Sequence, residues 1–265
     1  TGIVNRLTDH YDEVVKDATC RLLTYALNGN ADFMGDDIHY ASNHDFVGIE
    51  FTIHGMLDGR VRVGMPGKFN ADNALAALAV CTLALSGGSG VLDDHTKQAI
   101  LGSLVKVRVD GRMEIAHVSK KCSVIVDYAH NAVSMESLLT TLRDYHPKRL
   151  VCVFGCGGNR ARDRRYSMGE IGGKMADLCI ITADNPRFEK NEDIIKDIEV
   201  GLAKTDGTYL VIPDRREAIF YAIRNAEEGD MIAIIGKGHE DYQEIEGVKH
   251  HFLDREVVEE AVNNV

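Results

Sequence analysis

LCIITADNPR, residues 178–187, is the stretch that most directly predicts the fold of this chain. Its apolar half has the length and composition of a buried strand, and it stops abruptly at the polar corner Asp184–Arg187. A second apolar run, Met231–Ile235, stops in the same way at Gly236. Short apolar strands that end at such corners are typical of open parallel sheets, which present ligand-binding groups at the carboxyl ends of their strands.

The corner itself indicates the chemistry of a ligand. Pro186 fixes its own φ and biases Asn185 toward an extended conformation, so Asn185 and Arg187 are expected on a stiff turn. A forked guanidinium held there suits a carboxylate. We therefore expect an acidic small-molecule ligand.

From Ser123 onward, short apolar runs alternate with amphipathic segments. The expected strands are Val124–Val126, Leu150–Phe154, Leu178–Thr182, Tyr209–Ile212 and Met231–Ile235. The expected helices are 132–145, 168–176, 191–203, 214–226 and 254–263. This alternation predicts an α/β fold, a Rossmann-like and mostly parallel sheet with helices on both faces.

The first part of the chain has a different pattern of apolar and turn-forming residues. Residues 22–64 alternate short β-prone runs with turn signals, which predicts a small antiparallel sheet. The Ala/Leu-rich segment Asn73–Leu85 and the segment Asp94–Ser103 are expected to be helices. We expect two domains, residues 1–110 as the C-terminal part of an α/β domain and residues 111–265 as a complete one.

Composition narrows the class of protein. The 265 residues carry a net charge of −11, which argues against broad binding to nucleic acid or to anionic membranes. There is neither an apolar run of bilayer-spanning length nor a signal-peptide pattern. The 6 cysteines are scattered without a C-x-x-C pair, which favours reduced core thiols over disulfides or zinc. We expect a cytoplasmic monomer.

Two motifs in the middle of the chain allow a structural or a functional interpretation. Gly67–Asn73 opens the Ala-rich helix, and Asn70 or Asp72 would serve simply as its cap. In Gly111–Glu114, Arg112 is either a salt-bridge partner at the domain junction or a ligand for phosphate. The residues alone leave both questions open.

The segment Val126–His130 ends a buried-looking strand. Asp127 at a strand end is suited to accept hydrogen bonds from ribose hydroxyls, and Tyr128 beside it could cover a nucleobase. The alternative is an ordinary strand-to-helix cap followed by a core tyrosine. The position of Asp127 favours the functional interpretation.

Two glycine-marked turns follow later strands. Phe154–Arg160 would let backbone N–H groups approach an anion, although it is not a Rossmann fingerprint. The basic run Arg160–Arg165 is either a solvated face or, as we favour in an acidic protein, a face turned to anions. Gly236–His239 is not a phosphate-binding P-loop, because the Walker pattern occurs nowhere in the chain. His239 lacks partners at metal-ligand spacing, so we expect a structural or substrate-contacting role.

In this order the motifs resemble the Mur ligase family, and within it the ligases that add the third peptide residue of the peptidoglycan precursor. The matching segments are Gly67–Asn73, Gly111–Glu114, Val126–His130, Phe154–Arg160, Asp184–Arg187 and Gly236–Gln243. The resemblance spans essentially the whole chain and is densest after residue 110. Its last two motifs discriminate best within the family.

The resemblance implies ATP and Mg²⁺ as cofactors, and two sets of site residues. The implied nucleotide-binding residues are Asn70, Asn73, Arg112, Asp127, Tyr128 and His130, of which Arg112 is also the implied catalytic residue. The implied amino-acid-binding residues are Arg160, Asp184, Asn185, Pro186, Arg187, Gly236 and Glu240. The implied substrates are UDP-N-acetylmuramoyl-L-alanyl-D-glutamate and meso-diaminopimelate, which are joined through an acyl phosphate.

The chemistry of meso-diaminopimelate agrees with these assignments. Its distal amino-carboxylate end needs both a carboxylate partner and an ammonium partner, which Arg187 and Glu240 can supply. L-Lysine has no distal carboxylate, so Arg187 beside its side chain would be desolvated without a partner. The sequence therefore favours meso-diaminopimelate over L-lysine.

The chain also departs from the family pattern. Family members have three domains, and the first domain, the P-loop, the magnesium ligands and a carbamylated lysine would all precede residue 1. We accordingly expect no metal ligand in this chain and no catalysis by the chain alone. The rival interpretations are an L-lysine-adding ligase, another Mur or folylpolyglutamate-type ligase, and a non-catalytic binding module.

Overall fold

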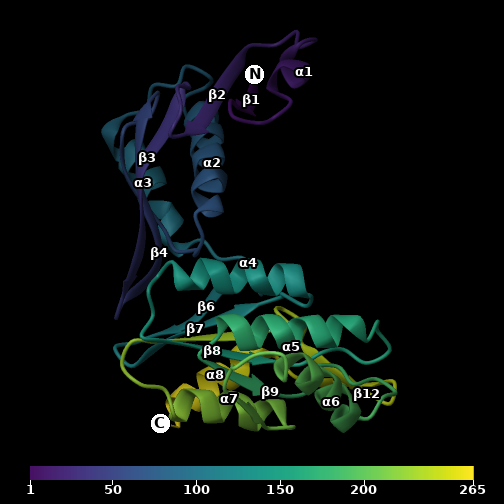
Figure 1. Cartoon of the computed structure of the whole chain (residues 1–265). Helices are drawn as coiled ribbons and strands as arrows, with labels where there is room; N and C mark the ends of the chain where they lie inside the picture. Colours follow the sequence, from purple (N-terminus) through teal and green to yellow (C-terminus); the bar gives the residue numbers. More distant parts are fainter. Residues whose placement is uncertain (265) are drawn as a thin grey trace. The chain divides into compact units, whose positions relative to one another are not determined.

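The computed structural model describes residues 1–264. The chain divides into two compact units, and each is considered by itself (Figure 1). The first comprises residues 1–42 and 47–107, and the second comprises residues 43–46 and 108–265. Within the described residues, no helix is both long and apolar enough to cross a membrane.

The first unit contains one five-stranded sheet and three α-helices. Its strands are β1 (Gly2–Asn5), β2 (Leu22–Leu27), β3 (Phe33–Asn43), β4 (Phe46–Gly55) and β5 (Gly59–Val63), in that order across the sheet. Its helices are α1 (Tyr11–Val15), α2 (Phe69–Leu85), α3 (Asp94–Ser103) and the short 3₁₀ segment η1 (Leu104–Lys106). The expected antiparallel sheet is wrong in part, because β1, β2 and β3 run parallel and β4–β5 is an antiparallel pair.

The core of the first unit lies between α2 and the sheet. Leu75 and Leu78 of α2 pack in one cluster with Ile49 and Phe51 of β4, and all four side chains are buried. The same cluster includes Leu101 of α3. Burial of these apolar surfaces holds the start of α2, where the Gly67–Asn73 motif lies, against the sheet.

The second unit is built on a six-stranded sheet. Its strands are β6 (Glu114–Val118), β7 (Cys122–Asp127), β8 (Arg149–Phe154), β9 (Leu178–Ile181), β10 (Tyr209–Val211) and β11 (Asp230–Ile235), in the order β10-β9-β8-β11-β7-β6. All neighbouring pairs are parallel except β6–β7, which is antiparallel. The five strands expected in this part of the chain and the parallel α/β fold are confirmed; β6 was not expected.

The helices of the second unit form two groups. They are α4 (Ala132–Arg143), α5 (Asp163–Met175), α6 (Asn191–Leu202), α7 (Arg215–Arg224) and α8 (Asp254–Asn263). Helix α5 packs against both α4 and α6, whereas α7 packs against α8 (Figure 1). Helix α5 begins at Asp163, five residues before the expected start, because ion pairs to α6 stabilise its arginine-rich first turn.

The strand order creates a crevice at the carboxyl ends of β8 and β11. These strands are neighbours in the sheet. The helix that follows β8 is α5, whereas the next helix after β11 is α8, which belongs to the other helix group. A reversal of this kind is where open α/β sheets bind ligands. A hairpin of β12 (Tyr242–Ile245) and β13 (Val248–His251), which the sequence analysis did not foresee, follows β11 beside the crevice.

Candidate functional site

A polar cavity of about 340 Å³ lies in this crevice. It is lined by Tyr128, His130, Gly155, Cys156, Gly157, Arg160, Arg164, Asp184, Asn185, Arg187, Gly236, Glu240 and Tyr242. Every residue predicted to bind the amino acid lines it except Pro186, which lies within the Asp184–Arg187 corner. Segments that follow β7, β8, β9 and β11 supply most of these residues, while Arg164 lies in α5 and Tyr242 begins β12.

The Asp184–Arg187 corner is held by backbone contacts on two sides. Gly158 donates its N–H to the Asn185 carbonyl at 2.9 Å. A Cβ at Gly158 would lie 1.9 Å from the Pro186 oxygen, so only glycine permits this approach. On the other side the Arg187 N–H donates to the Glu244 carbonyl of β12 at 3.0 Å. The glycine turn therefore acts here through close packing.

Arg187 combines an unusual backbone with a fixed side chain. Its φ is +54°, in the left-handed region that few residues other than glycine adopt. The guanidinium donates from Nη1 to the Gly158 carbonyl at 2.9 Å and pairs through Nε with the Glu244 carboxylate at 3.3 Å. Within residues 1–264, Nη2 makes no hydrogen bond, so it remains available at the cavity wall.

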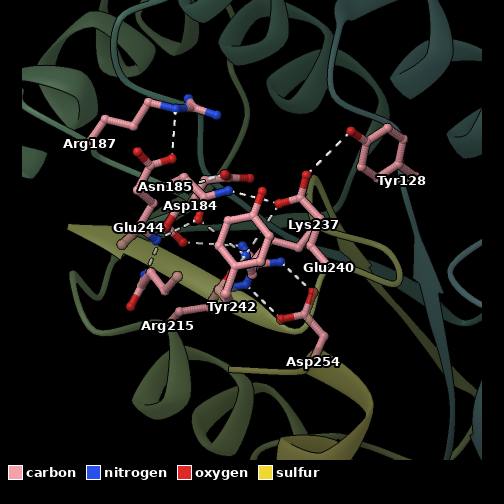
Figure 2. A network of polar contacts seen from close by, with 12 residues as sticks. Tyr128, Asp184, Asn185, Arg187, Arg215, Lys237, Glu240, Tyr242, Glu244 and Asp254 are labelled. Carbon is pink, nitrogen blue, oxygen red and sulfur yellow. Dashed lines mark hydrogen bonds and ion pairs between the residues drawn. The ribbon is translucent and has the colours of Figure 1, made fainter. Parts of the chain in front are cut away.

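Glu240 receives hydrogen bonds from two other parts of the site (Figure 2). The Tyr128 hydroxyl donates to Oε1 at 3.3 Å, and the Asn185 amide donates from Nδ2 to Oε2 at 2.8 Å. Burial, and then the nearby Glu240 carboxylate, raises the pKa of Tyr128, so its hydroxyl remains a donor. The Glu240 carboxylate is thereby held at the cavity wall as a counter-charge for a cation.

Beneath the cavity, a buried ion pair joins the ends of two strands. Arg215 donates from Nε and Nη2 to the carboxylate of Asp254, at 2.7 Å each, and both side chains are fully buried. The same guanidinium donates to the carbonyls of Ala183, after β9, and Ile235, at the end of β11. Sequence reasoning missed this pair, since nothing in the chain distinguishes a buried arginine at a helix start from an exposed one.

The basic run Arg160–Arg165 is not a single anion-facing surface. Arg162 and Arg165 form ion pairs with Asp197 of α6, at 2.7 and 2.9 Å, and Arg165 also pairs with Glu189. Arg160 and Arg164 line the cavity. Helical geometry explains the division, because Arg162 and Arg165 are three residues apart and Arg160 and Arg164 four, spacings that place each pair on its own face near the start of α5.

Cys156 lines the cavity without adding charge to it. Burial raises the pKa of Cys156 to about 12, so its thiol stays protonated. Arg160, Arg164 and Arg187 therefore face Asp184 and Glu240 across a space of amino-acid size. The site has the charge pattern of a receptor for a zwitterion.

The predicted nucleotide-binding residues fall in both units. In the second unit the Arg112 guanidinium lies 4.9 Å from the centre of the Tyr128 ring, and the His130 ring lies 4.9 Å from it on centroids. His239, exposed and 5.7 Å from Tyr128 on ring centroids, joins this group. A cation beside these tilted rings can contact phosphate and aromatic groups.

Asp127 and Asn70 instead satisfy local protein groups. Asp127 accepts from the Met113 and Ala129 N–H groups, at 2.7 Å each, and burial raises its pKa. In the first unit, buried Asn70 donates to the Pro66 carbonyl and accepts from Asn73 at 3.1 Å. Asn73 itself is exposed. The capping alternative for Asp127 is wrong, because Asn131 caps α4, and the nucleotide roles stay predictions.

A larger cavity of about 660 Å³ borders the same corner and includes Phe188, Glu192, Arg216 and Glu246. The larger cavity shares Arg187 with the smaller one and is lined by equal numbers of basic and acidic residues, whereas three arginines and two carboxylates line the smaller cavity. We assign the site to the smaller one for that reason. In residues 1–264, no three His, Cys, Asp or Glu side chains are grouped closely enough to hold a metal ion.

Comparison with known families accounts for both units. The family described as "Mur ligase middle domain" matches residues 1–81, and "Mur ligase, glutamate ligase domain" matches residues 111–238. The chain belongs to the Mur ligase family, whose members are ATP-dependent, amide-bond-forming ligases. The resemblance noted from the motifs is confirmed.

Individual relatives narrow the comparison to one kind of Mur ligase. The chain is 39% identical over 263 residues to UDP-N-acetylmuramoyl-L-alanyl-D-glutamate–2,6-diaminopimelate ligase 2 of Clostridium acetobutylicum, covering 98% of the chain and 52% of the relative. It is 40% identical over 254 residues to the ligase of the same description from Clostridioides difficile, covering 96% and 50%. A solved structure of a diaminopimelate ligase matches with a TM-score of 0.76 and 34% identity, over 99% of this chain and 53% of the other. The chain thus spans about half the length of the curated relatives it matches.

Proposed function

We propose that this chain forms the amino-acid-selecting part of an ATP-dependent ligase that adds meso-diaminopimelate to UDP-N-acetylmuramoyl-L-alanyl-D-glutamate. The observation that carries the proposal is the convergence of Arg160, Arg187, Asp184 and Glu240 on one cavity. The names of the relatives, all 2,6-diaminopimelate ligases, support the same substrate.

The cavity offers one cation and one anion that suit the carboxylate and the ammonium at the distal end of meso-diaminopimelate. Arg187 offers Nη2 to the distal carboxylate, while Glu240 offers its carboxylate to the distal ammonium. Arg160 pairs with no carboxylate in the described residues, which leaves its guanidinium for the second carboxylate of the ligand. Charge-assisted hydrogen bonds of this kind are about twice as strong as neutral ones.

We further propose that residues 1–110 and 111–265 are the C-terminal part of an ATP-binding domain and an amino-acid-binding domain. ATP fits the group formed by Arg112, Tyr128 and His130, because an exposed guanidinium lies against aromatic rings there. When bound, ATP would supply the phosphoryl group that activates the acceptor carboxylate. Asn73 is proposed to contact the adenine.

For Mg²⁺, unlike ATP, we propose no binding residues, because residues 1–264 contain no group of His, Cys, Asp or Glu side chains that fits the ion. We therefore derive no step through a metal held by this chain. A cytoplasmic location belongs to the same proposal and agrees with the free state of all 6 cysteines. The oligomeric state is proposed to be monomeric.

Isothermal titration of the 265-residue chain with meso-diaminopimelate and with L-lysine tests the proposal. We expect saturable binding of meso-diaminopimelate and binding of L-lysine at least about tenfold weaker, since one charge-assisted contact is worth roughly 1.5–3 kcal/mol. Equal affinities would contradict the proposed selectivity. Absence of any meso-diaminopimelate binding would contradict the proposed function.

Ligase activity can be tested by exchange into a full-length relative. A chimera carries this chain in place of the matching half of the Clostridium acetobutylicum ligase 2. We expect ATP-dependent incorporation of meso-diaminopimelate in preference to L-lysine. A chimera that folds and prefers L-lysine would overturn the assignment.

A further inference from the structure

We propose that Lys237 is a positioning residue for the amino-acid site, which fixes the Asn185 amide in one orientation and thereby holds Glu240 against the ligand's distal ammonium. The inference rests on the proposed function and adds to it a residue that does not line the cavity. Lys237 lies directly after β11, between the Asp184–Arg187 corner and the β12–β13 hairpin (Figure 2).

Lys237 is a buried cation whose three donors meet acceptors from three segments. Its side chain is fully buried. The ammonium donates to the Tyr242 carbonyl at the start of β12 and to Asn185 Oδ1 at 3.4 Å, and it lies 3.6 Å from Glu240 Oε2. A buried ammonium is costly unless its hydrogen-bonding capacity is used in this way.

Lys237 is one of the groups whose contacts set the orientation of the Asn185 side-chain amide. Asn185 Oδ1 meets two donors, the Lys237 ammonium and the Glu244 N–H at 2.9 Å. Asn185 Nδ2 meets the Glu240 carboxylate at 2.8 Å. The reversed amide would set an NH₂ group against both donors and an oxygen against the carboxylate, which are three repulsive contacts. Lys237 and the Glu244 N–H therefore together favour the orientation in which Asn185 donates to Glu240.

The charges around Lys237 suit a structural cation. Burial lowers the pKa of Lys237 and Arg215 lowers it further, whereas the carboxylates of Asp184, Asp254 and Glu240 raise it. Arg215 is already paired with Asp254. Lys237 is thus the cation that remains to face Glu240 and Asp184 from below the cavity.

This arrangement predicts an effect on one part of the ligand only. Without Lys237, the Asn185 amide loses one of the three contacts that set its orientation, and Glu240 loses the ammonium 3.6 Å from Oε2, so the distal ammonium meets a less ordered carboxylate. Arg187 is held separately by Gly158 and Glu244, so contacts to carboxylates are unaffected. A general loss of folding would instead weaken every ligand alike.

The test compares two ligands and three substitutions in the 265-residue chain by isothermal titration. The ligands are meso-diaminopimelate and 2-aminopimelate, which keeps both carboxylates and lacks one amine. Lys237→Met removes the ammonium and keeps a side chain of similar length. Lys237→Gln keeps an N–H donor group and is the second variant in case methionine prevents folding. Lys249→Met is the matched control, because Lys249 lies 4.0 Å over the same Tyr242 ring and is exposed.

We expect both Lys237 variants to bind meso-diaminopimelate about 10- to 100-fold more weakly, the equivalent of one charge-assisted hydrogen bond. Binding of 2-aminopimelate should change less than about threefold, and Lys249→Met should leave both ligands unchanged. Equal weakening of the two ligands, unchanged affinities, or tighter binding of meso-diaminopimelate would overturn the proposal.

A second readout separates this proposal from the proposed function. The side-chain amide resonances of Asn185 should shift or broaden in Lys237→Met without any ligand, because Oδ1 loses one of its two donors and a buried positive charge. Unchanged resonances would overturn the role of Lys237. If the unsubstituted chain fails to bind meso-diaminopimelate, the proposed function fails, and the Asn185 resonances still decide whether Lys237 orients the amide.

Discussion

Replacement of Arg187 by alanine should remove the preference for meso-diaminopimelate over L-lysine. The Arg187 guanidinium is held by the Gly158 carbonyl at 2.9 Å and by Glu244 at 3.3 Å, with Nη2 left for a ligand. Alanine removes the contacts from this guanidinium to the distal carboxylate. L-Lysine has no such carboxylate, so its binding should change little.

The size of the effect follows from the chemistry of that contact. A hydrogen bond to a charged group contributes about 1.5–3 kcal/mol, which corresponds to a roughly 10- to 100-fold loss of affinity for meso-diaminopimelate. The stability of the fold should fall by only about 1 kcal/mol, because Glu244 remains 22% exposed and hydrated. Alanine at the left-handed φ of +54° adds no backbone strain beyond that of arginine.

The assay is isothermal titration of both amino acids into Arg187→Ala and into a control, Arg216→Ala. Arg216 is also an ion-paired arginine, bound to Glu260, and it borders the larger cavity alone, whereas Arg187 lines both cavities. We expect the ratio of the two affinities to collapse in Arg187→Ala and to persist in Arg216→Ala. An unchanged ratio in Arg187→Ala would refute the reasoning, and a collapse in Arg216→Ala would move the site to the larger cavity.

Two further predictions concern the scaffold of the site. Burial alone would raise the pKa of Asp197, but hydrogen bonds from Arg162 and Arg165 outweigh it and lower that pKa, so the stability it contributes is lost as pH falls below about 4. Asp197→Asn should therefore lower the free energy of unfolding by about 3–5 kcal/mol at pH 7. In urea titrations, the variant should also lose less stability than the unsubstituted chain between about pH 5 and 2. Parallel profiles of stability against pH for the two proteins would count against this prediction. Gly158→Ala should destabilise by about 1–3 kcal/mol and weaken ligand binding, because its Cβ meets the Pro186 oxygen at 1.9 Å. A Cβ in Gly157→Ala would meet a side-chain atom, Arg187 Nη1 at 2.9 Å, rather than backbone, so this variant should cost less in thermal melts; equal losses would disprove the packing argument.

The parallel sheet and the place of the site could be predicted because both depend on local patterns. Apolar runs such as Leu178–Thr182 and Met231–Ile235 mark buried strands, and their ends must meet at one edge of the sheet. Six of the seven residues expected to bind the amino acid indeed line one cavity. Their individual roles stay predictions until a ligand is measured.

The polar layer beneath the cavity could not be predicted, because it depends on contacts between distant segments. Lys237 and Arg215 have the composition of surface residues, and their burial follows from partners such as Asp254, 39 residues after Arg215. The division of the run Arg160–Arg165 between the cavity and α6 could not be predicted for the same reason, since Arg165 meets Asp197 only after α5 and α6 pack. The parallel pairing of β2 with β3 likewise has no signature in the two strands alone.

The most direct test of the central claim is the position of meso-diaminopimelate in a crystal structure of this chain with the amino acid bound. We expect the distal carboxylate beside Arg187 Nη2 and the distal ammonium beside Glu240, within the smaller cavity. A ligand in the larger cavity, or one whose distal end points away from Arg187 and Glu240, would contradict it.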